Sequence, residues 1–181
     1  MMNHLAEDTK AWYAVYTRAR NEKKAMLALH EREVEAWLPM QKILTIRQSK
    51  KVWLEKPLIP SYVFVHLSPR QHDTVRYTPG ISNVVSFRGS AIPITPKEVK
   101  WLRLLEGNTA QWEKTAESFA KGDRVEVIAG PFQGMQGTLC EARQNTRLAV
   151  TIDSLNHTFL LKIDARWLKK LPARNKIHHA G

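Results

Sequence analysis

The chain has 181 residues, of which 43% are hydrophobic and 25% are charged, which excludes a globally disordered protein and suits one ordinary domain or two small ones. Its formal net charge is +11, and most of the excess lies in residues 10–118. This favours polyanionic partners, above all nucleic acid, over a basic surface that serves only solubility. Cys140 is the only cysteine, so an internal disulfide and a cysteine-based zinc site are excluded.

The beginning of the chain lacks an apolar segment of signal-peptide length, and no apolar run reaches the length of a membrane-spanning helix. We therefore expect a cytoplasmic protein without membrane contact. Seven histidines are scattered without a metal-binding spacing, and no serine lies in a nucleophile motif. The sequence thus predicts a binding protein that is not an enzyme and needs no metal or other cofactor.

The first strands of the chain are predicted from runs of aromatic and β-branched residues. Residues 42–56 alternate in part and carry basic side chains, which predicts a hairpin with a solvated basic tip around residues 48–51. Residues 35–39 are expected to be extended. The predicted strands are residues 12–16, 62–67 and 84–87.

Two helices are expected among these strands. Asn21 can cap a helix that reaches about Glu33, with small and apolar residues at helical spacing on one face. Thr95 and Glu98 have the spacing of a capping box, and the helix that follows can end at Gly107. These elements predict an α+β domain over residues 10–107, in which helices pack against a mostly antiparallel sheet.

The second half of the chain has a different texture. Residues 108–118 lack an apolar stripe and predict a linker, in which Trp112 could dock on a neighbouring domain. Residues 119–172 contain short strands separated by Gly- and Asn-containing turns, which predicts a small β-barrel. Residues 173–181 predict a flexible basic tail. The strands expected in the barrel are residues 124–128, 137–141, 148–152 and 158–163, with a last short one near Trp167.

Residues 130–137 read GPFQGMQG, and this glycine-rich stretch could be a phosphate-binding loop or a structural turn. A P-loop needs a Lys followed by Ser or Thr between a strand and a helix, and a dinucleotide site needs a G-x-G-x-x-G run before a helix. Neither pattern is present, and strand-like segments lie on both sides. The stretch therefore predicts a turn in which glycine supplies a left-handed backbone.

This stretch and its surroundings resemble a known motif. Residues 121–125 (KGDRV), residues 127–128 (VI) and the glycine-rich turn resemble the KOW motif of SH3-like barrels. The first domain independently resembles the NGN domain that precedes KOW in NusG/RfaH-like transcription factors. The matching segments are, in order, residues 12–16, 22–29, 38–39, 60–65 (PSYVFV), 78–81 (TPGI) and 95–98 (TPKE).

The resemblance implies a monomeric transcription elongation or antitermination factor whose NGN domain binds RNA polymerase across the DNA channel. Its hydrophobic pocket would receive the clamp helices of the largest subunit, and a polar segment would contact the other side of the cleft. Aromatic side chains suit such an anchor, although each could equally be ordinary sheet core. The candidate polymerase contacts are Trp12, Tyr16, Tyr62 and Phe64, with His72, Asp73 and Thr74 as the polar segment, which could also be a plain solvated loop.

The resemblance also implies contacts with the exposed non-template DNA strand. Arg18, Arg20, Lys23 and Lys24 lie on one short segment beside the first helix, and Thr78 lies where a neighbouring loop could support them. Basic side chains pair with phosphates, and Arg can also stack on an unpaired base. The alternative is a solvated helix start.

The KOW barrel would recruit a further partner, which in this family is a small-subunit ribosomal protein or Rho. Phe132 and Phe159 are the candidate contacts, with burial in the barrel as the alternative. Ser61 stands where housekeeping NusG proteins usually have Gly, which favours a specialised UpxY-type paralogue acting on particular operons, often for surface polysaccharides. Two other interpretations remain open, which are a housekeeping NusG and a ribosome-associated KOW protein that binds RNA.

Overall fold

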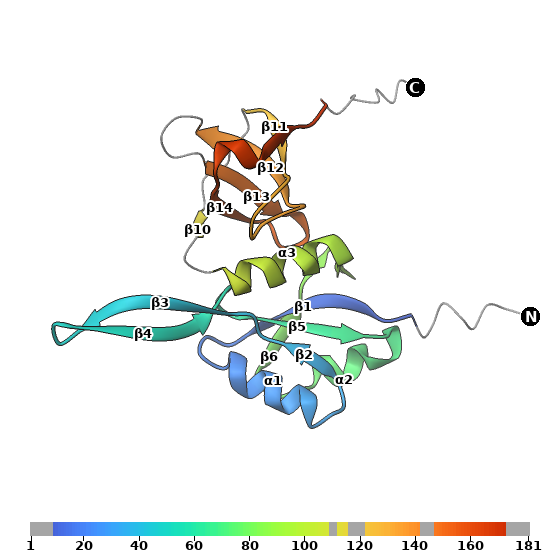
Figure 1. Cartoon of the computed structure of the whole chain (residues 1–181). Coiled ribbons are helices and arrows are strands. Elements are labelled where there is room, and N and C mark those ends of the chain that lie inside the picture. Colours follow the sequence, from blue (N-terminus) through green and yellow to red (C-terminus); the bar gives the residue numbers. More distant parts are fainter. Residues whose placement is uncertain (1–8, 109–111, 116–121, 142–146, 173–181) are drawn as a thin grey trace, which may run out of the picture. The chain divides into compact units, whose positions relative to one another are not determined.

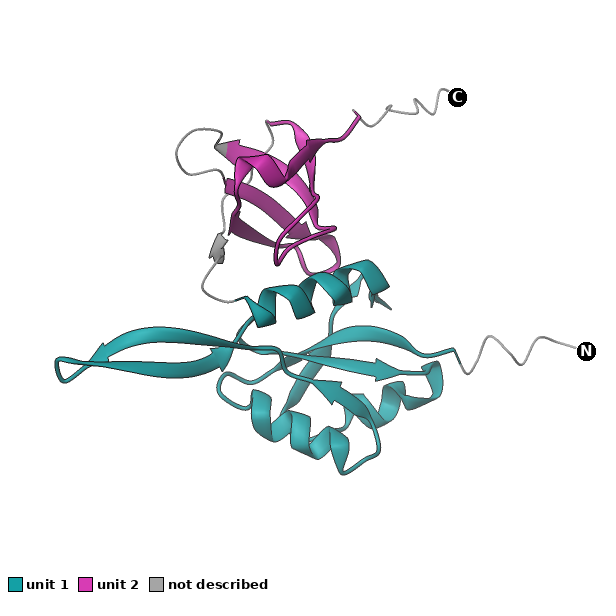
Figure 2. Ribbon diagram, in the orientation of Figure 1, with its two compact units in different colours: residues 1–110 teal, residues 111–181 magenta. Residues whose placement is uncertain are grey.

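The computed structural model describes residues 9–108, 112–115, 122–141 and 147–172, and the chain divides into two compact units, Met1–Ala110 and Gln111–Gly181 (Figure 2). Unit 1 combines helices with antiparallel sheets, and the described part of unit 2 is built from strands and short 3-10 turns. This is the α+β class that the sequence predicts. The expected tail, residues 173–181, lies outside the described residues.

Unit 1 is organised around a five-stranded antiparallel sheet in the order β2-β5-β1-β6, with β9 pairing with β1 beyond the end of β6. Helices α1 and α2 lie on one side of this sheet and α3 on the other (Figure 1). The strands are β1 (Ala11–Thr17), β2 (Glu35–Trp37), β5 (Tyr62–Leu67), β6 (Ile81–Val84) and β9 (Pro93–Ile94), and the helices are α1 (Glu22–His30), α2 (His72–Arg76) and α3 (Pro96–Gly107).

The main core of unit 1 lies between the sheet and α1 and α2. Alternate residues of a strand point to opposite faces, so one set of β1 and β5 side chains is directed at these helices. The members of this set in the core cluster are aliphatic and almost completely buried, and Tyr13, which is partly buried, packs against them. The core cluster comprises Val15, Leu29, Val34, Leu38, Val63, Val65, Leu67 and Val75.

Both predicted helices are present, with one shorter than expected. Helix α1 ends at His30 and not near Glu33, because Glu33 adopts a left-handed backbone (φ 58°) that a helix cannot continue. The capping box of α3 is confirmed. The amide of Thr95 donates to the Glu98 carboxylate at 2.9 Å, and the amide of Glu98 donates to the Thr95 hydroxyl at 3.2 Å.

The predicted basic hairpin is confirmed as β3 (Met40–Arg47) paired with β4 (Lys50–Pro57), and it extends away from the sheet (Figure 1). Gln48 and Ser49 form its two-residue turn, and both have a positive φ (48° and 63°). This is the backbone of the turn type whose twist matches a tight hairpin.

The strand predicted over residues 84–87 is wrong in its bounds. Strand β6 ends at Val84, and the next segment forms a separate small hairpin of β7 (Ser86–Phe87) and β8 (Ser90–Ala91). Val85 marks the change of partner, because its amide still donates to the Ala14 carbonyl of β1 at 2.9 Å, whereas its carbonyl accepts from the Ile92 amide at 3.1 Å. A run of β-forming residues does not show where a strand changes partner.

Unit 2 is a six-stranded antiparallel sheet in the order β10-β14-β13-β12-β11-β15. The strands expected from 124 to 163 and near Trp167 are all present, with bounds shifted by a few residues at most. The expected linker, however, contains a strand, β10, which pairs with β14 and extends the barrel toward the N-terminus. The strands are β10 (Trp112–Thr115), β11 (Arg124–Val127), β12 (Gln136–Glu141), β13 (Arg147–Ile152), β14 (His157–Lys162) and β15 (Leu168–Lys170).

Residues 109–111 and 116–118 of the expected linker lie outside the described residues, as do residues 119–121 of the expected barrel and the side chain of Trp112. The glycine-rich stretch is the turn that the sequence predicts. Gly130 and Gly134 have φ values of 79° and 85°, and no helix follows them directly.

Gly137 provides a test of how closely the barrel strands pack. A Cβ atom at this position would lie 2.2 Å from the Ala149 carbonyl oxygen of the neighbouring strand, whereas a Cβ at Gly134 would meet open space. We expect Gly137→Ala to lower the free energy of unfolding of unit 2 by about 1–3 kcal/mol, because the backbone must shift. Urea unfolding followed by circular dichroism measures the effect.

Gly134→Ala is the matched control, since it adds only the strain of a left-handed backbone, about 1 kcal/mol. Equal stability of the Gly137 variant and the wild type would show that the strands do not approach as closely as described.

Candidate functional site

Aromatic side chains gather on the face of the unit 1 sheet that carries α3. Trp12 stacks on His66 with ring centroids 5.0 Å apart, and it meets the edge of Trp37 at 6.0 Å. Trp37 in turn contacts Phe64 at 5.4 Å. The strand registers place these rings together, because Trp12 lies opposite His66 and Trp37 lies opposite Phe64. We call Trp12, Trp37, Phe64 and His66 the aromatic cluster.

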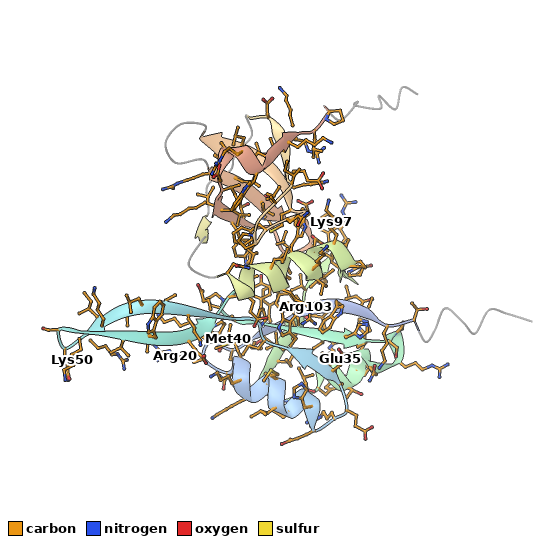
Figure 3. The ribbon with its side chains drawn as sticks, in the orientation of Figure 1. Arg20, Glu35, Met40, Lys50, Lys97 and Arg103 are labelled. Atoms are coloured by element: carbon orange, nitrogen blue, oxygen red, sulfur yellow. The ribbon has the colours of Figure 1, made fainter. Side chains whose placement is uncertain are left out.

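Helix α3 holds this cluster through polar contacts. The Trp37 indole nitrogen donates to the Glu106 carboxylate at 3.2 Å, and the Met40 amide donates to its other oxygen at 2.8 Å. The Arg103 guanidinium lies over the Trp37 ring, 4.5 Å from its centroid; Figure 3 marks Arg103 and Met40. Sequence analysis missed Trp37, since its role depends on the pairing of β2 with β5 and on a helix almost seventy residues further along the chain.

A pair of tyrosines lies on the same face, further along β1 and β5. Tyr16 lies opposite Tyr62, their ring centroids are 4.7 Å apart, and the Tyr62 hydroxyl donates to the Tyr16 hydroxyl at 3.0 Å. Tyr62 is buried, whereas Tyr16 is 39% exposed. Burial, together with the hydrogen bond and charge interaction with Tyr16, raises the pKa of the Tyr62 phenol well above its usual value.

The four aromatics expected to contact polymerase therefore differ in accessibility. Phe64 is completely buried and Tyr62 is 8% exposed, so both are sheet core in this structure. Trp12 is partly buried in the aromatic cluster. Tyr16 is the most exposed of the four and therefore the most accessible to a partner.

The polar segment expected to contact the other side of the cleft forms the start of α2, on the opposite side of the sheet. The His72 ring packs against the edge of Tyr13 with centroids 5.3 Å apart, and it is partly buried. Asp73 and Thr74 are exposed. The three residues thus form a surface separate from the tyrosine pair.

The expected nucleic-acid contacts gather around the start of α1. Arg18, Arg20, Lys23 and Lys24 are all exposed. The loop that carries the two arginines is fixed by its backbone, because the Arg18 amide donates to the Gly80 carbonyl at 3.3 Å and the Arg18 carbonyl accepts from the Asn21 amide at 3.0 Å. We call these four basic residues the basic segment.

An open concavity of about 560 Å³ lies beside the basic segment. Its lining combines apolar groups, the cations of Lys24 and Arg32 and the carboxyl group of Glu31, and Leu27 at its wall is 57% exposed. The loop after α2 closes one side, where the Gly80 backbone approaches α1 so closely that a Cβ there would lie 3.3 Å from the Ala25 Cβ. The lining residues are Asn21, Lys24, Leu27, Ala28, Glu31, Arg32, Pro79 and Gly80.

Thr78 lies buried in the loop beside this concavity. It is 2% exposed, and its hydroxyl donates to the Thr74 carbonyl at 2.7 Å, so it does not reach the surface. The Ile81 amide donates to the Thr78 carbonyl at 3.1 Å. Thr78 therefore shapes the loop beside the concavity and is not itself a contact residue.

Comparison with known proteins identifies the family. The sequence profile described as transcription termination factor nusG matches residues 10–103. These residues carry the tyrosine pair and the basic segment. The transcription termination/antitermination protein NusG of Thermus thermophilus is 30% identical over 164 residues, covering 78% of this chain and 89% of the relative. The chain belongs to the NusG family.

Other NusG proteins resemble the chain over nearly its whole length. NusG of Rickettsia bellii is 24% identical over 182 residues, covering 94% of this chain and 95% of the relative. A solved structure of Thermotoga maritima NusG has a TM-score of 0.57 at 25% identity, and the match covers 91% of this chain and 98% of that one. These similarities confirm the predicted NusG-like fold and the role of a transcription factor that is not an enzyme.

Among the described residues, no His, Cys, Asp and Glu side chains form a group of three or more that could hold a metal ion. The helices described here are also too short or too polar to cross a membrane.

The two barrel residues considered as partner contacts show the alternative that the sequence left open, which is burial in the barrel. Phe132 and Phe159 are completely buried, and with Met135 they fill the core of unit 2. Phe132 lies within the glycine-rich turn, but the turn folds its ring into the core of unit 2. The large hydrophobic side chain that unit 2 exposes among its described residues is Ile128, at 48%.

Ser61 connects the basic segment at the start of α1 with the tyrosine pair in this NusG-family chain. It has a left-handed backbone (φ 65°), its amide donates to the Glu22 carboxylate at 2.8 Å, and its carbonyl accepts from the Thr17 amide at 2.9 Å. Glu22 is 7% exposed and begins α1, while Ser61 immediately precedes Tyr62. This residue therefore ties the start of α1 to the start of β5.

The left-handed backbone at Ser61 provides a second prediction. We expect Ser61→Gly to raise the free energy of unfolding of unit 1 by up to about 1 kcal/mol, because glycine avoids most of the strain that a side chain causes in this region. Thermal or urea unfolding measures the change.

Ser82→Gly is the control, since Ser82 lies in β6 and its φ is not positive. That variant should lose stability through the added freedom of the unfolded chain. A loss of stability in both variants would contradict the strained backbone at Ser61.

Proposed function

We propose that this protein is an elongation and antitermination factor that binds RNA polymerase across the DNA cleft and disfavours pausing or termination. The observation that carries the proposal is the exposed Tyr16, held against the buried Tyr62 on the sheet face of a NusG-family domain. The clamp helices of the largest polymerase subunit are the partner proposed for this face. His72, Asp73 and Thr74 are proposed to contact the opposite side of the cleft.

The tyrosine pair suits an interface anchor on physical grounds. Tyr16 offers a large aromatic area, and its orientation is already fixed by the ring contact and hydrogen bond with Tyr62, so little side-chain freedom disappears on binding. A factor that binds the closed form of polymerase more tightly than the open form shifts the population toward the closed form. Such a factor needs no chemical step to shorten a pause.

The basic segment and the neighbouring concavity are proposed to bind the non-template DNA strand. The four exposed cations suit the phosphates, and the concavity combines the apolar wall of Leu27 and Pro79 with the cations of Lys24 and Arg32, as an unpaired nucleotide would require. Because Thr78 is buried, its proposed part is to hold the loop that carries Pro79.

We further propose a specialised, UpxY-type role on particular operons, such as those for surface polysaccharides, carried out by a monomer in the cytoplasm. Ser61 supports this choice, because it occupies a left-handed position for which glycine is the usual residue. A housekeeping NusG is the alternative, and it would occupy most transcribed genes instead of a few.

Unit 2 is proposed to recruit a small-subunit ribosomal protein or Rho. Since Phe132 and Phe159 are buried, the contact is proposed to centre on Ile128, which lies directly after β11. A ribosome-associated protein that binds RNA is the alternative for the whole chain, and the NusG profile match over residues 10–103 disfavours it.

The polymerase proposal predicts that Tyr16→Ala weakens binding to a reconstituted elongation complex. We expect the affinity to fall about tenfold or more, as is common when a central aromatic anchor is truncated, and pauses to last longer than with the wild type. Tyr16→Phe should have a much smaller effect, because it keeps the ring. Binding is measured by fluorescence anisotropy and pausing by single-round transcription.

Phe87→Ala is the matched control, because Phe87 is 64% exposed and lies on the separate β7–β8 hairpin. Phe64 is unsuitable for this test, since truncating a completely buried ring would test folding. Equal affinities of wild type and Tyr16→Ala would refute the proposed docking face.

The DNA proposal predicts a change in salt dependence. We expect Arg20→Gln or Lys24→Gln to weaken binding to single-stranded DNA and to reduce the slope of log affinity against log salt concentration by about 0.7 for each phosphate that is no longer neutralised. Lys100→Gln on α3, across the sheet from α1, should leave the slope unchanged. Measuring the affinity for single-stranded DNA from low to moderate salt concentration gives these slopes. Unaltered slopes in all three variants would count against DNA binding by the basic segment.

A further inference from the structure

The β3–β4 hairpin carries an exposed apolar surface that the proposed polymerase and DNA contacts do not use. Leu44 lies directly opposite Trp53 in the strand register, and Ile46 follows on the same face of β3. These side chains are 49%, 64% and 71% exposed for Leu44, Trp53 and Ile46. We call these three residues the hairpin patch.

The hairpin patch lacks the support that an apolar sheet face usually has. Strands β3 and β4 pair only with each other among the described strands, and tertiary hydrogen bonds hold the hairpin at its base. There the Met40 amide binds Glu106 and the Leu58 amide donates to the Pro39 carbonyl at 2.8 Å. Single exposed apolar side chains are ordinary, but three adjacent ones at the centre of a projecting arm indicate a contact surface.

The charges around the patch restrict what can cover it. Lys42 and Glu55 form a loose ion pair (3.9 Å) at the base of this face, and Lys51 lies opposite Ile46 near the tip. Glu55 is the only acidic residue of the hairpin, and Figure 3 marks Lys50 at its tip. An acidic surface complements this arm, whereas the arm of a second copy would be repelled. The basic residues of the hairpin are Lys42, Arg47, Lys50, Lys51 and Lys56.

The composition of the patch favours a protein over a nucleic acid. Trp53 alone could stack on an unpaired base, but Leu44 and Ile46 are aliphatic and offer no stacking surface. An aromatic anchor flanked by aliphatic side chains and surrounded by charged groups is the usual arrangement of a protein–protein contact.

We propose that the hairpin patch docks on a protein surface of the transcription elongation complex that is acidic at its rim and apolar at its centre. The patch is distinct from the surface around Tyr16, because it lies on a separate two-stranded sheet. This inference rests on the proposed function, because it places the docking surface within the elongation complex. The contact would give the factor a second anchor on its partner.

Photocrosslinking tests the kind of occupant. Trp53 of the full-length chain is replaced by p-benzoylphenylalanine, the protein is bound to a reconstituted elongation complex, and the illuminated products are treated with nuclease. We expect a nuclease-resistant product in which mass spectrometry finds a polymerase peptide rich in Asp and Glu. A nuclease-sensitive product, a product with a second copy of the chain, or no product would overturn the proposal.

Affinity measurements test how much the hairpin patch contributes to binding of the elongation complex. Trp53→Ala should weaken binding to the elongation complex by about tenfold or more, because it removes the aromatic anchor of the patch. Val52→Ala is the matched control, because Val52 is 38% exposed on the opposite face of the same strand, and it should change affinity by less than about twofold. Circular dichroism confirms that both variants fold.

The two proposals fail in different ways. If Tyr16→Ala weakens binding and Trp53→Ala does not, the hairpin patch is refuted and the proposed function stands. If the wild type does not bind the elongation complex at all, both are refuted. If both variants weaken binding, the factor holds its partner at two separate surfaces.

Discussion

The antiparallel pairing of β1 with β5 is the constraint on which unit 1 depends. It directs Val15, Val63 and Val65 toward α1 and α2, and it directs Trp12, Tyr16 and Phe64 toward the side that carries α3. A shift of one residue in this register would exchange the two sets and place aromatic rings against helices that pack on valines. The accessible tyrosine and the buried core are therefore fixed by the same set of hydrogen bonds.

The two candidate surfaces of unit 1 are mechanically joined. Glu22 is the first residue of α1, and its carboxylate holds the Ser61 amide directly before Tyr62. A hydrogen bond thus links the start of the helix that carries Lys23 and Lys24 to the start of the strand that carries Tyr62. Breaking a hydrogen bond to a charged group that is nearly buried is costly, which makes this link rigid.

Features that a local pattern specifies could be predicted from the sequence, as the capping box of Thr95 and Glu98 and the barrel strands show. The accessibility of individual side chains could not be predicted in this way. Phe132 lies in a turn yet is buried, because the turn folds back on the barrel core. Trp37 was overlooked, since its importance comes from Glu106 and Arg103, which only the tertiary fold brings near it. A local sequence pattern determines where helices and strands form. The burial of a side chain depends on which other elements of the fold pack against it.

The independence of the β3–β4 hairpin has a consequence for how such a chain can change over evolution. Its base is fixed by Glu106 and by the Pro39–Leu58 hydrogen bond, while the described strands beyond the base pair only with each other. Adding two residues to each strand would lengthen the arm by about 7 Å and keep every side chain on its face, whereas adding one would turn the outer part over. The reach of the arm can therefore vary in steps while the sheet that carries it stays the same.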